Sequence, residues 1–600
     1  MRFSDYIAQR LVEFGVRHVF MLTGGGAMFL NYAIGSHPRL KVIFNHHEQA
    51  CAMAAEGYAR ITNKPGVLNV TTGPGGVNAL NGVYGAFTDS IPMLVLSGQV
   101  KRETYIRSYD LPGLRQLGDQ EIDILSMVKG ITKYAVTVVD PQEIRYHLEK
   151  AWYLAQSGRP GPVWLDIPID VQSSFVDVET LTGFDSAEMP RPIVSEILSG
   201  QVRETLTRIQ FAARPVILAG TGVRLAGAVG LFNEVVHKLG IPVTTGWTHD
   251  LIASDDPVFC GRPGTIGTRP GNFAVQNADV LLVLGSRLNI RQTGYAFKSF
   301  ARAAHKIWVD IDPAELNRPT VQPDTPIIAD IGIFLAEMNR QLDERQWEKR
   351  QFTGWLDWCK ERIKRYPAVL ENQRKFNGKI NPYHFIEMLF QQLDTDDVVV
   401  TGNATACVVS FQVAQLKFGQ RLFSNSGAAS MGYDLPAAIG AAVAHGGRVI
   451  CLAGDGSLQM NIQELQTVVR YGLPIKIVVL NNEGYLSIRT SQKNFFGGVV
   501  GEGPTSGVTF PDYVKLAEAY GIPACRIDGA DFPLSLRKSL DAPGPALMEV
   551  ILDPTQGFEP RQSSRSLPDG RIISAPLEDL FPFLHREELR ENLLIPEWSE

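Results

Sequence analysis

Two short polar segments, each following a predicted buried strand, have the residue types of a magnesium site. The strand from Arg448 to Ala453 ends just before Asp455, and the next strand, from Ile475 to Leu480, ends just before Asn482. In a right-handed strand-helix-strand unit the carboxyl ends of the two strands lie side by side, so we expect both side chains to point into one crevice. Mg²⁺ prefers a few hard oxygen ligands from the protein. Asp455, Asn482 and the backbone carbonyl of Gly484 are therefore the predicted metal ligands.

The residues around Asp455 indicate what the metal would accompany. Gly454 and Gly456 would let the backbone approach a diphosphate closely, and Ser457 lies at a helix start whose free N–H groups can bind phosphate oxygens. By itself, a Gly-Asp-Gly segment is commonly only a turn. Its position at a strand end, beside a second strand end with two asparagines, favours a phosphate-binding site.

Glu48 is the candidate acid–base group. It follows the predicted strand Val42 to Phe44 and lies in the first turn of an Ala-rich helix. Alone, such an acid would be explained by its favourable interaction with the helix dipole. Two glycine-rich strand ends accompany it, and their candidate ligand contacts are Gly25, Gly26, Pro74 and Asn78. A carboxyl group in an apolar pocket can hold a proton and exchange it with a bound ligand, so Glu48 is predicted to be catalytic.

The elements that carry these residues have the pattern of a parallel α/β protein. Short β-branched runs alternate with helical stretches in three blocks, so the predicted fold class is α/β, with three doubly wound parallel-sheet domains. The predicted units are a first α/β domain (1–175), a linker (176–200), a central α/β domain (201–345), a connecting helix (346–380), a third α/β domain (381–555) and a carboxyl-terminal tail (556–600).

The bulk composition indicates small-molecule chemistry. The 600 residues carry a net charge of only −6 and contain no run of Lys and Arg, so we expect neither a nucleic-acid partner nor a membrane surface. No apolar run approaches the roughly 18 residues of a membrane span. The six cysteines are widely spaced and form no C-x-x-C pair, which is typical of reduced thiols. We therefore expect a cytoplasmic enzyme.

From Phe20 to about Pro554 the chain resembles the acetolactate (acetohydroxyacid) synthase family of thiamine diphosphate enzymes. The motifs that carry the resemblance are His47-Glu48-Gln49, Ala55-Glu56-Gly57-Tyr58-Ala59-Arg60, Gly73-Pro74-Gly75, Ser97-Gly98-Gln99-Val100, Gly158-Arg159-Pro160-Gly161-Pro162-Val163 and Gly454-Asp455-Gly456-Ser457. The resemblance implies that Glu48 hydrogen-bonds the aminopyrimidine ring and that Met431 holds thiamine diphosphate in a bent shape. It also places Gln120, Asn403, Ala404 and Ala429 near the cofactor.

The resemblance further implies the reaction and the assembly. The enzyme would decarboxylate a 2-oxo acid, pyruvate, and transfer the two-carbon unit to a carbonyl acceptor. In this family Glu48 of one subunit and Asp455 of its partner belong to one site, so the expected assembly is a homodimer or a homotetramer.

The central block is similar to the FAD-binding domain of the synthase family. The matching segments are Gly220-Thr221-Gly222, Gly285-Ser286-Arg287 and Asp310-Ile311-Asp312-Pro313. The candidate FAD contacts are Arg159, Gly220, Gly222, Arg287, Arg291, Asp310 and Asp330. Relatives bind FAD, ADP or nothing in this domain, and acetolactate formation needs no redox turnover, so a bound flavin would be structural. The alternative is an ordinary doubly wound domain with an empty crevice.

Three positions depart from the family where it shapes the acceptor pocket. Asp119 stands where Phe is usual, Thr265 stands where Met is usual, and Arg489-Thr490-Ser491-Gln492 lacks the usual Trp. A buried polar wall costs free energy unless a ligand pairs with it, so the acceptor is expected to carry hydroxyl or carbonyl groups. A keto-sugar acceptor, as in relatives that build branched-chain sugars, therefore competes with a second pyruvate. The same fold would also suit a flavin-using pyruvate oxidase or a paralogue that has lost catalysis.

Overall fold

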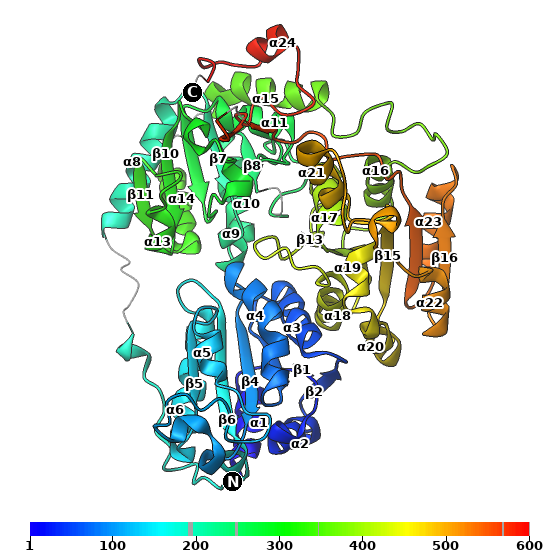
Figure 1. Ribbon diagram of the computed structural model, residues 1–600. Coiled ribbons are helices and arrows are strands. Elements are labelled where there is room, and N and C mark those ends of the chain that lie inside the picture. Colours follow the sequence, from blue (N-terminus) through cyan, green and yellow to red (C-terminus); the bar gives the residue numbers. More distant parts are fainter. Residues whose placement is uncertain (190–195, 247–249, 346, 348, 567–568, 599–600) are drawn as a thin grey trace.

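The computed structural model describes residues 1–189, 196–246, 250–345, 347, 349–566 and 569–598. Three sheets, each built from parallel strands and covered by helices, form three bodies that follow one another along the chain (Figure 1). The prediction of an α/β protein with three parallel-sheet domains is confirmed. Residues 190–195 of the predicted linker lie outside the described residues, as do 346 and 348 of the connecting segment and 567–568 and 599–600 of the tail.

The first sheet has the strand order β2-β1-β3-β4-β6-β5 and carries Glu48 at its edge. Its strands are β1 (His18–Met21), β2 (Lys41–Phe44), β3 (Gly66–Val70), β4 (Met93–Gln99), β5 (Tyr134–Thr137) and β6 (Pro162–Pro168). Its helices are α1 (Phe3–Glu13), α2 (Met28–Ser36), α3 (Glu48–Thr62), α4 (Pro74–Thr88), α5 (Ile124–Val128), α6 (Ile144–Gln156) and α7 (Ile169–Ser173). The strands β3, β4 and β6 are fully buried, as expected for the centre of a sheet with helices on both faces.

The second sheet has the order β11-β10-β9-β7-β8. Its strands are β7 (Pro215–Ala219), β8 (Val243–Thr245), β9 (Val280–Leu284), β10 (His305–Asp310) and β11 (Thr325–Ile328). Its helices are α8 (Glu196–Phe211), α9 (Gly222–Leu225), α10 (Val229–Leu239), α11 (Arg269–Gln276), α12 (Ile290–Thr293), α13 (Pro313–Leu316) and α14 (Ile331–Glu344). Within the predicted connecting segment, the α-helix is α15 (Thr353–Arg365).

The third sheet, of order β13-β12-β14-β15-β17-β16, repeats the six-strand plan of the first. Its strands are β12 (Val398–Thr401), β13 (Arg421–Phe423), β14 (Val449–Gly454), β15 (Ile475–Asn481), β16 (Ala524–Ile527) and β17 (Ala546–Ile551). Its helices are α16 (Pro382–Gln392), α17 (Ala404–Val413), α18 (Asp434–His445), α19 (Asp455–Gln459), α20 (Leu465–Tyr471), α21 (Leu486–Phe496), α22 (Tyr513–Ala519) and α23 (Phe532–Asp541). Because β14 and β15 pair in parallel, their carboxyl ends lie at the same edge, as the spacing of Asp455 and Asn482 predicted.

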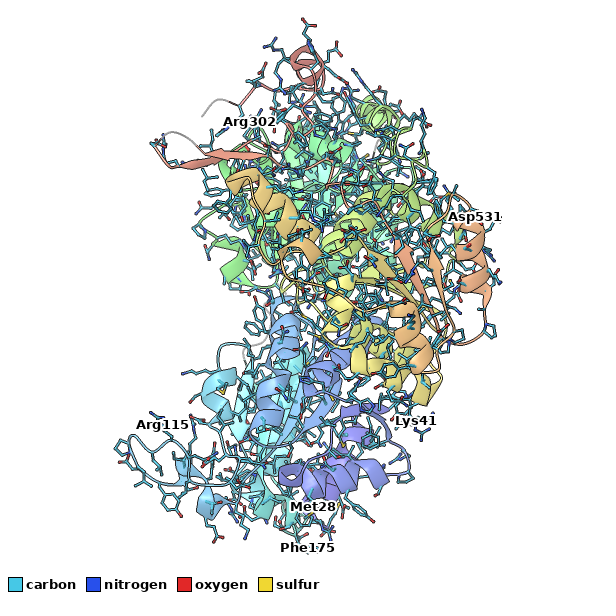
Figure 2. All side chains as sticks on the ribbon, turned by 45° about the vertical axis from the view of Figure 1, so that its right-hand side comes forward. Met28, Lys41, Arg115, Phe175, Arg302 and Asp531 are labelled. Carbon is cyan, nitrogen blue, oxygen red and sulfur yellow. The ribbon has the colours of Figure 1, made fainter. Side chains whose placement is uncertain are left out.

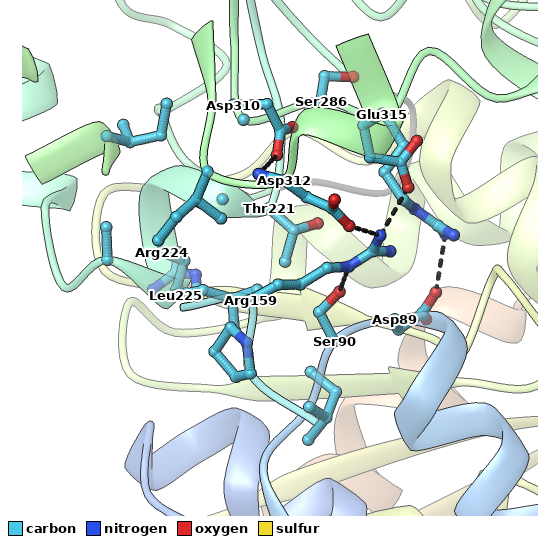
Figure 3. Close-up of a pocket in the computed structure, with 18 of the residues that line it drawn as sticks. Asp89, Ser90, Arg159, Thr221, Arg224, Leu225, Ser286, Asp310, Asp312 and Glu315 are labelled. Atoms are coloured by element: carbon cyan, nitrogen blue, oxygen red, sulfur yellow. Dashed lines mark hydrogen bonds and ion pairs between the residues drawn. The ribbon is translucent and has the colours of Figure 1, made fainter. Parts of the chain in front are cut away.

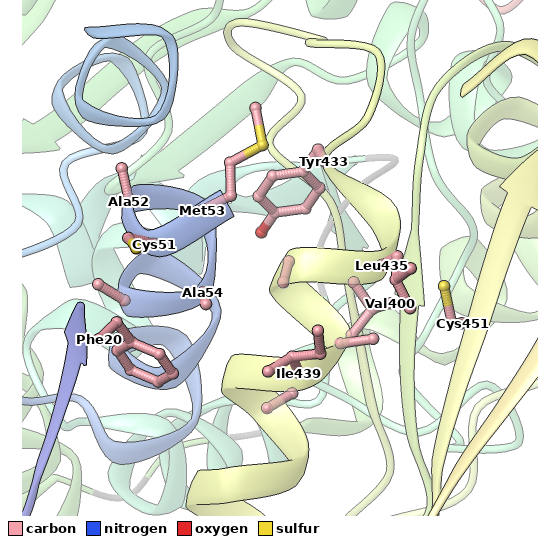
Figure 4. Packing of buried hydrophobic residues seen from close by; sticks show 14 of the residues in the cluster. Phe20, Cys51, Ala52, Met53, Ala54, Val400, Tyr433, Leu435, Ile439 and Cys451 are labelled. Atoms are coloured by element: carbon pink, nitrogen blue, oxygen red, sulfur yellow. The ribbon is translucent and has the colours of Figure 1, made fainter. Parts of the chain in front are cut away.

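Helices α3 and α18 hold the first domain against the third. A Cβ built on Gly57 would lie 2.3 Å from the Ala437 carbonyl oxygen, and one built on Gly440 would lie 1.9 Å from the Ala54 carbonyl oxygen. The two helices therefore approach more closely than any larger residue would allow. Figure 4 shows Ala54 on α3 facing Ile439 on α18 in this contact. The start of α3, where Glu48 lies, is thus fixed to the third domain.

The carboxyl-terminal tail returns to the central domain. It contains β18 (Ser564–Ser566), β19 (Ile572–Ser574) and α24 (Arg586–Glu591), and it crosses the top of the molecule in Figure 1. Leu577 and Leu580 are buried, and Glu578 accepts a hydrogen bond from Arg302 at 2.8 Å. The tail is therefore packed against the central domain along much of its length. Among the described residues, no helix is long and apolar enough to cross a membrane.

Candidate cofactor site and central cavity

Glu48 is the first residue of α3 and lies in a buried position. Its side chain is 7% exposed, and its Oε2 accepts a hydrogen bond from the Asn78 amide at 3.0 Å. Asn78 comes from α4, so two neighbouring helices orient the carboxylate. A Cβ on Gly75 would lie 2.7 Å from Thr71 Cγ2 and 3.4 Å from Glu48 Oε1, so the Gly73–Gly75 turn packs closely beside the acid. The structure therefore brings Glu48 and Asn78 together, as the sequence predicted.

The two glycine turns of the first domain meet beside this acid. The Gly26 N–H donates to Thr71 Oγ1 at 3.1 Å, which joins the turn containing Gly25 to the end of β3. Gly73 has a φ of +57°, and a Cβ there would lie 1.9 Å from the Gln120 carbonyl oxygen, so only glycine fits before Pro74.

Gln120 reaches this turn from the long loop between β4 and α5. It has a positive φ of 60° and an exposed side chain, and Arg115 of the same loop stands at the edge of the molecule in Figure 2. Gln120 is thus placed beside the Gly73 turn and is free to reach a ligand there.

Asp455 and Asn482 lie side by side at the carboxyl ends of β14 and β15. Asp455 is 2% exposed, and it accepts hydrogen bonds from the N–H groups of Gly456 at 2.8 Å and Gly484 at 2.9 Å. Burial raises the pKa of the Asp455 carboxyl to about 6. The Asn482 amide donates to Thr405 Oγ1 at 3.0 Å, which fixes the direction of its oxygen. These contacts bring the three predicted metal ligands together at one edge of the sheet.

Arg489 holds the Asn482 loop together through its guanidinium group. Its guanidinium donates to the carbonyl oxygens of Asn482 at 3.2 Å, Glu483 at 2.8 Å and Pro554 at 3.1 Å. It also pairs with Glu502 at 2.6 Å, and both side chains are largely buried. Its role is therefore to position the predicted metal loop. The sequence carried no signal of this contact, because Arg489 sits in an ordinary helical stretch.

The loop that carries Met431 connects the two halves of the site. The Asn403 amide donates to the Ala429 carbonyl at 3.1 Å, and the Gly432 N–H donates to Ser457 Oγ at 2.9 Å. Ala404 and Ala429 both have positive φ values, of 47° and 53°. A non-glycine residue in this region is strained, and such strain is often found at functional sites.

The same loop also contacts the first domain, because Ser430 Oγ donates to Asn81 Oδ1 at 2.7 Å. The predicted diphosphate residues are arranged around its other end. Gly454 precedes α19, and a Cβ on Gly456 would lie 2.1 Å from the Tyr485 ring. Close approach of the backbone at Gly456 therefore requires glycine.

A cavity of about 1040 Å³ lies between the central domain and the first domain, and residues 421–424 and 426 of the third domain also line it (Figure 3). Ligand pockets commonly measure roughly 300–1,000 Å³, so this one has room for a large ligand. Six of the seven predicted FAD contacts line it: Arg159, Gly222, Arg287, Arg291, Asp310 and Asp330. Gly220 lies behind the wall, where a Cβ would meet the Gly285 carbonyl at 2.4 Å.

The charged groups of the cavity are arranged in pairs. Arg159 donates to Ser90 at 2.8 Å, to Asp312 at 2.9 Å and to Glu315 at 2.7 Å, as Figure 3 shows. Burial raises the pKa of Asp310 to about 6. In the part of the chain that the structure describes, the Arg291 side chain has no ion-pair partner. Arg291 is thus the cation most available to an anionic ligand.

Three family models match the chain in the order of its sheets. They are the thiamine pyrophosphate enzyme N-terminal TPP binding domain (residues 1–127), the central domain (residues 202–338) and the C-terminal TPP binding domain (residues 401–550). The fold and the two glycine-rich sites therefore define a thiamine pyrophosphate enzyme.

Similarity to individual proteins identifies the family within this class. The chain is 34% identical to acetolactate synthase 2, chloroplastic, of Zea mays, over 92% of this chain and 85% of the relative. It is also 34% identical to the acetolactate synthase large subunit of Porphyra purpurea, over 92% of each chain, and 32% identical to acetolactate synthase 1, chloroplastic, of Nicotiana tabacum, over 92% of this chain and 81% of the relative. The chain belongs to the acetolactate synthase family of thiamine pyrophosphate enzymes, as its sequence motifs predicted.

Proposed function

We propose that this enzyme decarboxylates pyruvate and transfers the two-carbon unit to a carbonyl acceptor, as an acetolactate synthase-type lyase and transferase. The observation that carries the proposal is the buried Glu48 carboxylate, held by Asn78 beside the glycine turns of a TPP-binding domain. The similarity to proteins named acetolactate synthase supports this reaction type.

The residues present fit thiamine diphosphate and Mg²⁺. Asp455 Oδ, Asn482 Oδ1 and the Gly484 carbonyl would hold Mg²⁺, and Gly454, Gly456 and Ser457 would hold the diphosphate. When bound, thiamine diphosphate supplies the electron sink for decarboxylation.

The protein's own part in the chemistry is positioning and proton transfer. Glu48 would hold a proton on its Oε1 or Oε2 at the pyrimidine ring, and Asn78 would keep the carboxyl group in one orientation. Gln120, from the adjacent loop, would bind the reacting carboxylate or carbonyl. Burial of Glu48 excludes water from this proton transfer.

The central cavity would bind FAD. Arg287 and Arg291 would contact the diphosphate, and Asp310 and Asp330 would accept hydrogen bonds from ribose hydroxyl groups. Acetolactate formation is redox-neutral, so the flavin would have a structural role. Anaerobic pyruvate should then leave the flavin spectrum unchanged, whereas bleaching would support a pyruvate oxidase activity instead.

A hydroxyl-bearing acceptor, such as a keto-sugar, is the second candidate. Thr265 is only 6% exposed, and its Oγ1 has no hydrogen-bond partner among the described residues. Its backbone N–H donates to the Arg291 carbonyl at 2.8 Å, so the Thr265 segment is held against the segment that carries Arg291. A buried unpaired hydroxyl favours a ligand that can hydrogen-bond to it.

Product analysis distinguishes the two acceptors. The enzyme would be supplied with thiamine diphosphate, Mg²⁺, FAD and ¹³C-pyruvate, first alone and then with separate 2-oxo acids and keto-sugars, and the products identified by mass spectrometry. Labelled acetolactate supports the first candidate, and a labelled branched sugar supports the second. If labelled carbon dioxide is released under none of these conditions, the proposed function is wrong.

We also propose that two subunits share each site, in a homodimer or homotetramer. Mixing Glu48→Gln subunits with Asp455→Asn subunits tests this directly. Random dimers should recover about a quarter of wild-type activity, because half of them are mixed and each mixed dimer has one intact site of two. No recovery after subunit exchange would assign both residues to one chain. A cytoplasmic location is proposed because each of the six cysteines is free.

A further inference from the structure

The Asp89 carboxylate touches all three domains. Asp89 ends α4 of the first domain and is 8% exposed. Its Oδ2 accepts a hydrogen bond from Arg60 of the same domain at 2.8 Å. Its Oδ1 accepts from Arg287 of the central domain at 3.3 Å and from the backbone N–H of Gly427 of the third domain at 3.1 Å. One oxygen atom therefore joins the central domain to the third.

We call the contact of Asp89 with Arg60, Arg287 and Gly427 the Asp89 junction. Its Arg287 side faces the central cavity. Arg287 and Asp89 both line the cavity, and Figure 3 shows Asp89 and Ser90 at its edge, near Arg159 and Glu315. Arg287 is 25% exposed, and its 3.3 Å contact is longer than the other contacts described for Asp89. A ligand that binds the Arg287 guanidinium therefore acts on a group that directly contacts Asp89.

The Gly427 side leads to the thiamine diphosphate loop. Gly427 lies four residues before Met431, in the segment that also contains Ala429. A Cβ on Gly427 would lie 2.3 Å from Asp89 Oδ1 and 3.0 Å from Arg287 Nη2, so the loop approaches both charged groups as closely as glycine allows. A displacement of Asp89 toward the loop would push on Gly427, and a displacement away from it would break the hydrogen bond from the Gly427 N–H.

We propose that Asp89 is a positioning residue that couples the central cavity to thiamine diphosphate binding. An anionic flavin or nucleotide that engages Arg287 fixes Asp89 and Gly427 in place, and the ordered loop then binds thiamine diphosphate more tightly. The inference rests on the proposed function, because it needs a ligand that enters the cavity. Coupling between two binding sites is reciprocal, so thiamine diphosphate must also tighten the binding of the cavity ligand.

Titration of the full-length apo-enzyme tests this coupling. The Kd of thiamine diphosphate would be measured at fixed Mg²⁺ by fluorescence quenching, with and without saturating FAD, and FAD binding would be measured separately by flavin fluorescence. In the wild type, FAD should lower the Kd of thiamine diphosphate by about fivefold or more. Asp89→Asn should raise that Kd without FAD and abolish the effect of FAD. Asp343→Asn is the matched control, because it breaks an exposed Asp–Lys238 pair on the outer side of the central domain and should keep the full effect.

A second variant tests the loop side of the junction if Asp89→Asn folds poorly. Gly427→Ala should still bind FAD, weaken thiamine diphosphate binding and remove the coupling. The inference is overturned if FAD binds the wild type but leaves the Kd of thiamine diphosphate unchanged, or if Asp89→Asn and Gly427→Ala keep the wild-type ratio. Failure of FAD to bind the wild type would instead refute the proposed flavin site, and the ligand-coupled role of Asp89 with it.

Discussion

Replacing Arg489 by methionine tests how much the loop that carries Asn482 and Gly484 contributes to Mg²⁺ binding. The variant removes the guanidinium that bonds the Asn482, Glu483 and Pro554 carbonyls, and it leaves Glu502, which is 5% exposed, without its cation. Methionine keeps most of the apolar stem, so lost packing contributes little.

The expected magnitude follows from these contacts. Removing one partner of a buried ion pair costs about 3–5 kcal/mol, and the 13% exposure of Arg489 favours the lower end of that range. Residues that orient metal ligands typically change metal affinity by about 10–100-fold. We therefore expect Arg489→Met to raise the Kd of Mg²⁺ by about 10–100-fold, which corresponds to a loss of about 1.4–2.7 kcal/mol of binding free energy.

Arg448→Met is the matched control for this experiment. Arg448 pairs with the buried Asp397 at 2.6 Å, in the same domain but just before the amino end of β14, away from the Asn482 loop. Both variants should lower the unfolding midpoint. Only Arg489→Met should weaken Mg²⁺ binding, measured by titration in the presence of thiamine diphosphate. Equal Mg²⁺ affinity in the two variants would refute the assignment of Arg489 to the metal loop.

Three further changes test other parts of the structure. Glu48→Gln should bind thiamine diphosphate almost normally but lose about 10²–10⁴-fold in turnover, because glutamine cannot exchange the proton; near-normal rates would contradict the role of Glu48. Burial raises the pKa of the Asp166 carboxyl to about 7. In the folded protein this group therefore keeps its proton up to about pH 7, whereas in the unfolded chain it loses the proton above about pH 4. Wild-type stability should therefore fall as pH rises from about 4 to 7, and Asp166→Asn should flatten this part of the curve of unfolding midpoint against pH. Gly57→Ala should lower the midpoint, because its Cβ would lie 2.3 Å from the Ala437 carbonyl and overpacking costs about 1–3 kcal/mol. Gly35→Ala, whose Cβ meets nothing within 4 Å, should leave the midpoint unchanged or raise it.

Strand ends were the most predictable part of the molecule. The predicted strand from Val42 to Phe44 ends where β2 does, and the predicted strand from Ile475 to Leu480 ends one residue before β15 does. These runs are apolar and β-branched, and a polar residue or glycine stops them at the sheet edge. The neighbouring positions of Asp455 and Asn482 followed from the handedness of a single local unit.

Contacts between distant segments could not be predicted. Asp89 bonds Arg60, Arg287 and Gly427, which lie 29, 198 and 338 residues away. Nothing in the local sequence around Asp89 marks it as a junction, because its partners come from all three domains. Arg489 is a second example. Its contacts depend on how the loop ending at Glu502 folds back, and the residues around Arg489 carry no signal of that arrangement.

The packing of the carboxyl-terminal tail has a consequence for synthesis of the chain. Leu577 fills part of the apolar cluster that also contains Trp308 and Leu281 of the central sheet. These strands leave the ribosome more than two hundred residues before Leu577 does. The apolar surface that Leu577 covers therefore stays exposed until translation is almost finished. Premature termination would release a chain in which this surface remains exposed, where chaperones can bind it and it can aggregate.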